Sequence, residues 1–220
     1  KSAHFVTGTP VDTIFTRQQQ RNRQSRNAWD LFAAHRERTT DLLTSGIPSA
    51  GGRICILGAG NCNDLDLKTL TDVFDEVHLV DFDSGALDYG VRFQGLPCGD
   101  PLHLHGDVDV TGIVPAMSKW TPNTPPVLED LAKCLKTARS AAIPIRAEPF
   151  EVVASVCLMT QLIDSVALAI GESHSHFADL MTAVRNRHLQ HLVELSSPGG
   201  RIYLITDIVS SVSFPELPNI

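Results

Sequence analysis

The sequence lacks the paired cysteines of a disulfide scaffold or a structural zinc module. Its five cysteines are odd in number, and none of them forms a Cys-x-x-Cys pair. Thiols in that pattern are typical of reduced cysteines in the cytosol. We therefore expect a cytoplasmic protein without disulfide bonds.

Long apolar runs and an excess of positive charge are also missing. No run approaches the roughly eighteen apolar residues that span a bilayer, and no signal peptide is visible. Because the chain opens with Lys1, we expect that its natural start was cleaved or lies outside these residues. The net charge of −7 disfavours a nucleic-acid backbone as the main partner. We expect a small-molecule partner and no membrane, and no pattern indicates an oligomeric state.

The stretch Arg53–Leu67, RICILGAGNCNDLDL, organises the rest of the chain. A short apolar run leads into Gly58-Ala59-Gly60, and a helical pattern begins near Asp64. Strand, glycine turn and helix in that order are typical of the first unit of a nucleotide-binding α/β sheet. Glycines allow the sharp turn and the close approach of a ligand. We expect the unpaired amides at the helix start to face the same space.

Strand and helix patterns alternate through the remainder of the sequence. We expect strands near 54–57, 76–80, 102–105, 150–155 and 201–206, and helices near 64–72, 84–91, 111–120, 127–140, 156–170 and 173–196. This order predicts an α/β fold with a doubly wound, mostly parallel sheet and helices on both faces. The ligand crevice should lie at the carboxyl ends of the first four strands.

We expect a single domain, with an N-terminal helical arm or lid in residues 1–52 and a Rossmann-like core in 53–220. A continuous helical pattern covers about 12–45, and residues 17–27 hold four arginines. The simpler interpretation of those arginines is a solvated helical face or a partly mobile arm. The alternative is that 28–43 is a lid helix, with His35, Arg36 or Arg38 facing an anion.

The residues around the glycine turn indicate a ligand without phosphates. Asn63 stands where a dinucleotide site places its third glycine, and no Gly-Lys-Ser/Thr phosphate loop exists. Asp81, at the end of the second strand, could accept both hydroxyls of a ribose, with Phe82 against the purine. Asp107, after the third strand, could accept the adenine amine, with Val108 packing on its face. These requirements describe an adenosine with no charged pyrophosphate.

At this point the sequence resembles the class I S-adenosylmethionine-dependent methyltransferases. The matching segments, in the family's order, are ILGAGNCNDLDL, HLVDFDSGAL, HGDVDV, FEVVASVCLMTQL and SPGGRIYLITDI. The resemblance implies S-adenosylmethionine as cofactor and methyl transfer to an unidentified small-molecule acceptor. The cofactor-binding residues that it implies are Gly58, Ala59, Gly60, Asn61, Asp81, Phe82, Gly106, Asp107, Val108 and Ser155. Of these, Ser155 would lie beside the transferable methyl group.

The sequence departs from that family at several positions. Ile56 replaces a frequent acid, Cys62 replaces a glycine, and Ser155 replaces the usual Asp or Asn of the fourth strand. That strand also lacks the Asn-Pro-Pro-Tyr signature of nucleic-acid amino methylation. The family's closing antiparallel hairpin is not present by residue 220, so we expect either an incomplete chain or a trimmed fold.

Simpler roles remain open for several of these residues. The two glycines could form a plain turn, and Asp81 and Asp107 could be helix caps, with Asp83 and Asp109 nearby. Asp64 is interpreted as a helix N-terminal acid, favoured there by the helix dipole.

The sequence names no catalytic base, and no metal site is expected. His103 and His105 share a strand face, but packing is the simpler role for them. Cys157 is interpreted as a core thiol because no histidine is evident beside it. Two other functions stay possible: an NAD(P)-dependent oxidoreductase, and a non-catalytic S-adenosylmethionine-binding protein.

Overall fold

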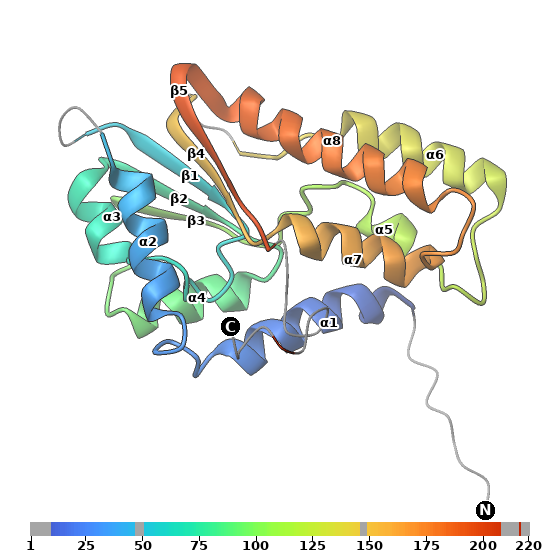
Figure 1. The fold of residues 1–220 in the computed structure, drawn as a ribbon, viewed down its shortest axis with the longest axis horizontal. Coiled ribbons are helices and arrows are strands. Elements are labelled where there is room, and N and C mark those ends of the chain that lie inside the picture. Colours follow the sequence, from blue (N-terminus) through green and yellow to red (C-terminus); the bar gives the residue numbers. More distant parts are fainter. Residues whose placement is uncertain (1–9, 47–50, 146–148, 208–215, 217–220) are drawn as a thin grey trace, which may run out of the picture.

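The structure is a computed structural model, and it describes residues 10–46, 51–145, 149–207 and 216. It contains a five-stranded, all-parallel sheet in the order β3-β2-β1-β4-β5 (Figure 1). The strands are β1 (Arg53–Leu57), β2 (Glu76–Val80), β3 (Leu102–His105), β4 (Phe150–Val156) and β5 (Ser196–Ile205). The predicted α/β class is confirmed, and the architecture is Rossmann-like.

The apolar run of β1 is explained by its central position in the sheet. Ile54 pairs with Val77 of β2 on one side and with Val152 of β4 on the other. Residues 54–57 are fully buried, because helices cover both faces of a parallel sheet and leave no side of the strand to water.

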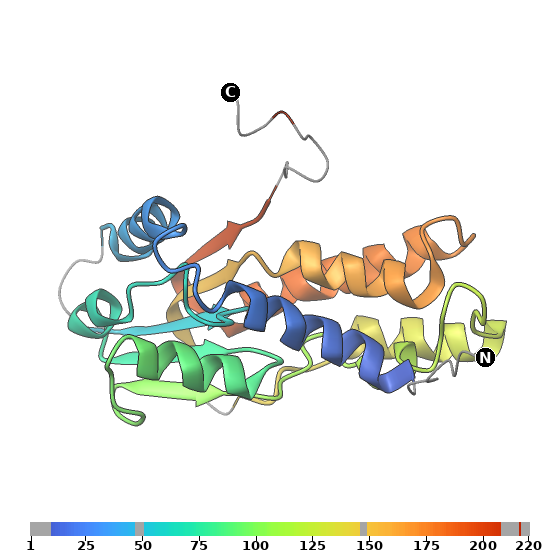
Figure 2. The same ribbon diagram turned by 90° about the horizontal axis from the view of Figure 1, so that it is seen from below.

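Helices form a layer on each face of the sheet (Figures 1 and 2). They are α1 (Pro10–Ser25), α2 (Ala33–Thr44), α3 (Leu67–Val73), α4 (Ser84–Phe93), α5 (Val114–Met117), α6 (Leu128–Ser140), α7 (Met159–Ile170) and α8 (Phe177–Leu195). Leu43 of α2, Leu70 of α3 and Leu87 of α4 pack with β1 and β2 in one core. Helices α5 to α8 pack in the other core, around residues such as Leu131 and Val166. None of the described helices is both long enough and apolar enough to cross a bilayer.

The helical pattern over 12–45 divides into two helices, which corrects the expectation of one. The chain leaves α1 after Ser25 and resumes as α2 at Ala33. The connection is fixed by Arg36, whose guanidinium lies 3.4 Å from the centroid of the Trp29 ring and donates to the Trp29 carbonyl at 2.9 Å. These contacts hold the connection in a conformation in which α2 packs against α3. Hydrophobic periodicity alone does not predict such a turn.

Several other helix and strand bounds differ from expectation, among them the start of α3 at Leu67 instead of near Asp64. Helix α5 covers only Val114–Met117, and α7 begins at Met159 because β4 continues to Val156. Helix α8 begins at Phe177. Strand β5 begins at Ser196, because Ser196 pairs with Phe150 before a register shift. The expected turn at 198–200 therefore lies inside a bulged strand, with Gly199 at φ +81°.

Candidate functional site

The glycine turn lies where β1 ends, against the start of the segment that follows β4. Gly58 has φ +81°, and a Cβ placed on it would lie 2.7 Å from Leu158 Cβ and 2.9 Å from the Val156 carbonyl oxygen. The amides of Gly58 and Ala59 both donate to the Val80 carbonyl, at 2.9 and 3.2 Å. The turn is therefore anchored to the end of β2 and closely packed against the end of β4.

Asp81 follows β2 and joins that strand end to the glycine turn. Its Oδ2 accepts from the Gly60 amide at 2.8 Å, and its Oδ1 accepts from the Asp83 amide at 2.9 Å. Burial raises the pKa of Asp81 to about 6, and the two amides oppose that rise. Asp83, and not Asp81, caps α4 by accepting from Ala86. Because each carboxylate oxygen has two lone pairs, Asp81 can still accept from a ligand.

Two neighbouring hollows open at this edge of the sheet. The first, here the polar cleft, has a volume of about 670 Å³. Its lining includes Arg21, Asn22, Ser25, Phe32, His35, Gly58, Ala59, Gly60, Asn61, Asn63, Asp64, Cys157, Gln161, Asp164 and Asp207. The second, here the apolar hollow, has about 50 Å³ of free space and is lined by Ile14, Gln18, Val80, Asp81, Phe82, Val108, Asp109, Thr111, Met117, Leu162 and others. Gly58 and Gln161 line both, so the two hollows adjoin.

Most of the residues expected at the cofactor site line one of these hollows. Gly58, Ala59, Gly60 and Asn61 line the polar cleft. Asp81, Phe82 and Val108 line the apolar hollow.

Three expected residues line neither hollow. Ser155 is fully buried, with its hydroxyl 2.8 Å from His188 Nε2. Asp107 is exposed and accepts from the Ser84 hydroxyl, whereas Asp109 faces the apolar hollow. A Cβ on Gly106 would lie 2.4 Å from Ser84 Cβ, so Gly106 allows the close contact of β3 with α4.

The amides at the start of α3 do not point freely into the site, contrary to expectation. The Asp66 amide donates to Thr40 Oγ1, the Leu67 amide to Gln94 Oε1, and the Thr69 amide to Asp66 Oδ1. Asp66 is thus the cap of α3, and the interpretation of Asp64 as the helix N-terminal acid is not supported. Side chains satisfy these amides, so an anion would have to displace them to bind there.

Helix α1 lines both hollows, with Ile14 and Gln18 in the apolar hollow and Arg21, Asn22 and Ser25 in the polar cleft. Asn61 Nδ2 donates to the Ser25 hydroxyl at 3.0 Å, and Asn63 Nδ2 donates to the Ser25 carbonyl at 2.7 Å. Arg17 and Arg21 both pair with Asp164 of α7. The arginine-rich segment is therefore attached to the core through some of its side chains, while Arg17 and Arg23 are exposed, as expected of a solvated helical face.

The lid alternative is supported in part. His35 of α2 lines the polar cleft. Arg36 donates instead to the Asn63 carbonyl at 3.0 Å, and Arg38 is exposed outside the cleft lining. On the α1 side, the Phe15 ring lies edge-on against the Phe82 ring, with 5.2 Å between the two ring centroids.

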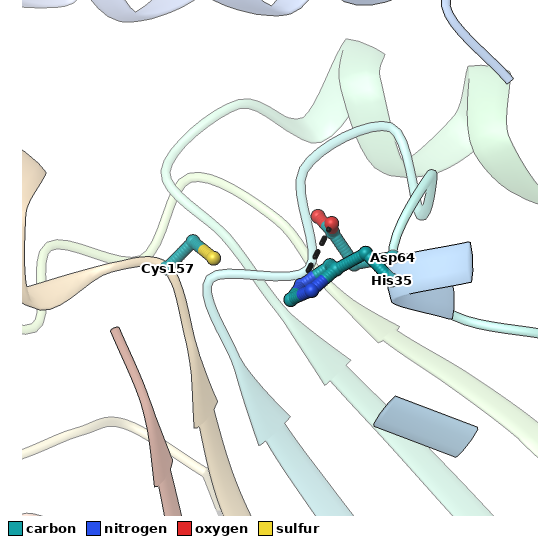
Figure 3. A group of neighbouring side chains, drawn as sticks. All are labelled: His35, Asp64 and Cys157. Carbon is teal, nitrogen blue, oxygen red and sulfur yellow. Dashed lines mark ion pairs between the residues drawn. The ribbon is translucent and has the colours of Figure 1, made fainter. Parts of the chain in front are cut away.

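A group of side chains that the sequence did not bring together lies in the polar cleft. His35, Asp64 and Cys157 place one potential ligand atom each within 4.8 Å of the others (Figure 3). His35 Nε2 lies 3.3 Å from Asp64 Oδ1. Cys157 is half-buried, packs against the apolar core and also lines the cleft, so only the expectation that no histidine lies beside it is wrong. The three residues come from distant segments, and no local spacing pattern could have identified them.

The geometry of the site stands without support from known relatives. No model of a known protein family matches the chain, and no curated protein sequence matches it.

Proposed function

We propose that the chain binds S-adenosylmethionine and transfers its methyl group to a small-molecule acceptor. The observation that carries the proposal is the arrangement at the carboxyl ends of β1 and β2. There the glycine turn, the Asp81 carboxylate and the two adjoining hollows of contrasting polarity come together. In open α/β sheets, ligands bind at this edge.

The two hollows suit the two ends of such a donor. The adenosine would enter the apolar hollow, with its ribose hydroxyls donating to Asp81 and its base against Phe82 and Val108. The methionine end carries an ammonium, a carboxylate and the sulfonium, and it would lie in the polar cleft, which offers Arg21 and Asp64. The free space of the apolar hollow is small, so Phe82 and the α1 side chains that cover it would have to move apart. Ligand sites of drug-sized molecules typically span about 300–1,000 Å³, and the polar cleft lies in that range.

A dinucleotide fits the same site less well. Its pyrophosphate needs unpaired amides at a helix start, and at α3 those amides already donate to side chains. A donor without a pyrophosphate has no such requirement. This contrast favours S-adenosylmethionine over NAD(P).

The proposed reaction needs positioning more than acid–base chemistry. The acceptor heteroatom attacks the methyl carbon in line, and the carbon–sulfur bond breaks with its electron pair remaining on sulfur. The products are S-adenosylhomocysteine and the methylated acceptor, which gives up its proton to solvent. Holding the reactants in line and excluding water supply most of the rate enhancement.

Calorimetric titration with S-adenosylhomocysteine tests the donor site. Asp81→Asn should weaken binding roughly 10- to 100-fold, because hydrogen bonds to a charged group contribute about 1.5–3 kcal/mol. Asp130→Asn, on the exposed face of α6, is the matched control and should bind like the unmodified protein.

A second variant guards against misfolding at Asp81, which also holds the turn. Phe82→Ala removes the ring expected against the base and leaves the Asp81 hydrogen bonds in place. Unchanged affinity in both variants would remove the apolar hollow from the donor site.

Fluorescence titration with NADH should show no binding, and a response lost in Asp81→Asn would favour the oxidoreductase.

A further inference from the structure

We propose that His35, Asp64 and Cys157 form a binding site for a zinc-like divalent cation, with an open coordination position facing the polar cleft. This inference does not rest on methyl transfer.

The first argument is the convergence of three ligand atoms on one point. The atoms lie within 4.8 Å of one another. Two ligands of a tetrahedral zinc ion, at bond lengths of about 2.0–2.3 Å, stand roughly 3.5 Å apart. The 3.3 Å between His35 Nε2 and Asp64 Oδ1 already matches that spacing. Figure 3 shows the Cys157 thiol pointing from the end of β4 toward this pair.

The second argument is the local structure of two of the residues. Cys157 has φ +51°, a left-handed conformation that is costly for any residue with a Cβ. Strain of this kind clusters at functional sites. Asp64 Oδ1 is shielded from solvent and accepts no hydrogen bond from the residues that the structure describes, so its one close partner is His35.

The third argument is electrostatic. Asp207 lies on the same cleft as Asp64 and Cys157. Two carboxylates therefore share the cleft with the thiol, and their charge would stabilise a bound cation.

The types of ligand atom indicate which metal ion the site would prefer. A thiolate and an imidazole with one carboxylate favour zinc over magnesium or calcium, which prefer oxygen ligands. On binding, the Cys157 thiol loses its proton to solvent as the sulfur–metal bond forms. Three protein ligands leave a fourth position for water or a substrate atom, as in catalytic zinc sites.

A second group of potential ligands, Glu76, His78 and His103, is less suitable. His78 already uses both ring nitrogens, with Nδ1 at 2.9 Å from His105 and Nε2 at 3.1 Å from Glu76. A metal there would have to break this network. We therefore place the cation at Cys157.

The test is titration of the metal-stripped full chain with Zn²⁺, monitored by calorimetry. We expect one equivalent to bind, and at least 10- to 100-fold weaker affinity in Cys157→Ser, His35→Gln and Asp64→Asn. Cys98→Ser, at the exposed thiol, and His176→Gln, at a partly exposed histidine, are the matched controls and should bind normally. Undiminished binding in Cys157→Ser, or loss only in Cys98→Ser or His78→Gln, would overturn the proposal.

Substitution with Co²⁺ keeps the test decisive if a ligand variant does not fold. In the Cys98→Ser protein, bound Co²⁺ should show a thiolate-to-metal charge-transfer band in the near ultraviolet. Bound Co²⁺ without that band would exclude Cys157 as a ligand. Titration of the metal-free protein with S-adenosylhomocysteine tests the methyl donor site without the metal. Failure of one proposal can therefore be told apart from failure of the other.

Discussion

At the residue scale, Gly58 is a position where backbone conformation and packing both oppose a side chain. It combines φ +81° with a space that Leu158 and the Val156 carbonyl close to any side chain. Gly58→Ala should lower the free energy of unfolding by about 2–4 kcal/mol, the sum of left-handed strain and overpacking. Urea denaturation measures this change.

Gly95 provides the control for that substitution. It has φ +72°, but a Cβ there would meet nothing within 4 Å. Gly95→Ala should therefore lower stability by only about 1–2 kcal/mol, from backbone strain alone. Equal losses in the two variants would show that contact with Leu158 and Val156 contributes nothing.

Some site residues have positions that the sequence predicts, because a local strand end sets them. Others have positions that depend on contacts with distant segments, which the sequence does not predict. Asp81 was predictable because a strand end fixes its position relative to the neighbouring glycine turn. Asp107 and Asp109 stand two apart after the same strand, and the positive φ of Asp107 decides which faces the apolar hollow. Ser155 was placed at the site by the family resemblance, whereas the structure buries its hydroxyl against His188.

At the element scale, α1 and α2 are held to the core by polar contacts with the glycine turn. Asn63 is central, because its side-chain amide donates to Ser25 and its carbonyl accepts from Arg36. Asn63→Ala should destabilise the protein by about 1–3 kcal/mol, the range for losing one partner of a buried hydrogen bond. It should also speed tryptic cleavage in the arginine-rich segment of α1.

Limited proteolysis and urea denaturation check this prediction together. Asn123→Ala, in the exposed loop before α6, should change neither cleavage nor stability. Cleavage of α1 at the unmodified rate in Asn63→Ala would mean that apolar packing alone holds the helix.

The elements of the core were predictable from sequence and the arm was not. Strands β1, β2 and β3 occur where expected, because central or well-covered parallel strands are short apolar runs bounded by polar turns. The break between α1 and α2 depends on the Trp29–Arg36 contact and on Asn63, which is distant in sequence. Hydrophobic periodicity does not predict contacts of this kind.

At the scale of the whole molecule, a buried histidine links stability to pH. His188 is 1% exposed, and burial, with His191 nearby, lowers its pKa from 6.5 to about 4. The unfolded chain therefore binds a proton between about pH 6.5 and pH 4, and the folded chain does not. Stability from this group is complete above pH 6.5 and is lost progressively as the pH falls toward 4.

Denaturation at about pH 7.5 and about pH 5 measures this linkage. Between these values the unmodified protein should lose roughly 2 kcal/mol more stability than His188→Gln does. His176→Gln, at a partly exposed histidine, should follow the unmodified protein. The same pH dependence in His188→Gln would assign the acid sensitivity to other groups.

The attachment of α1 to both hollows has a consequence for the timing of ligand exchange. A molecule bound between this helix and the sheet can leave only as fast as the Asn61, Asn63 and Asp164 contacts open. Under the proposed methyl transfer, product release rather than bond making would limit turnover, as in enzymes whose lids govern product release. The contacts of α1 would thus set the residence time of a bound molecule, although the strands that bind it lie elsewhere in the sequence.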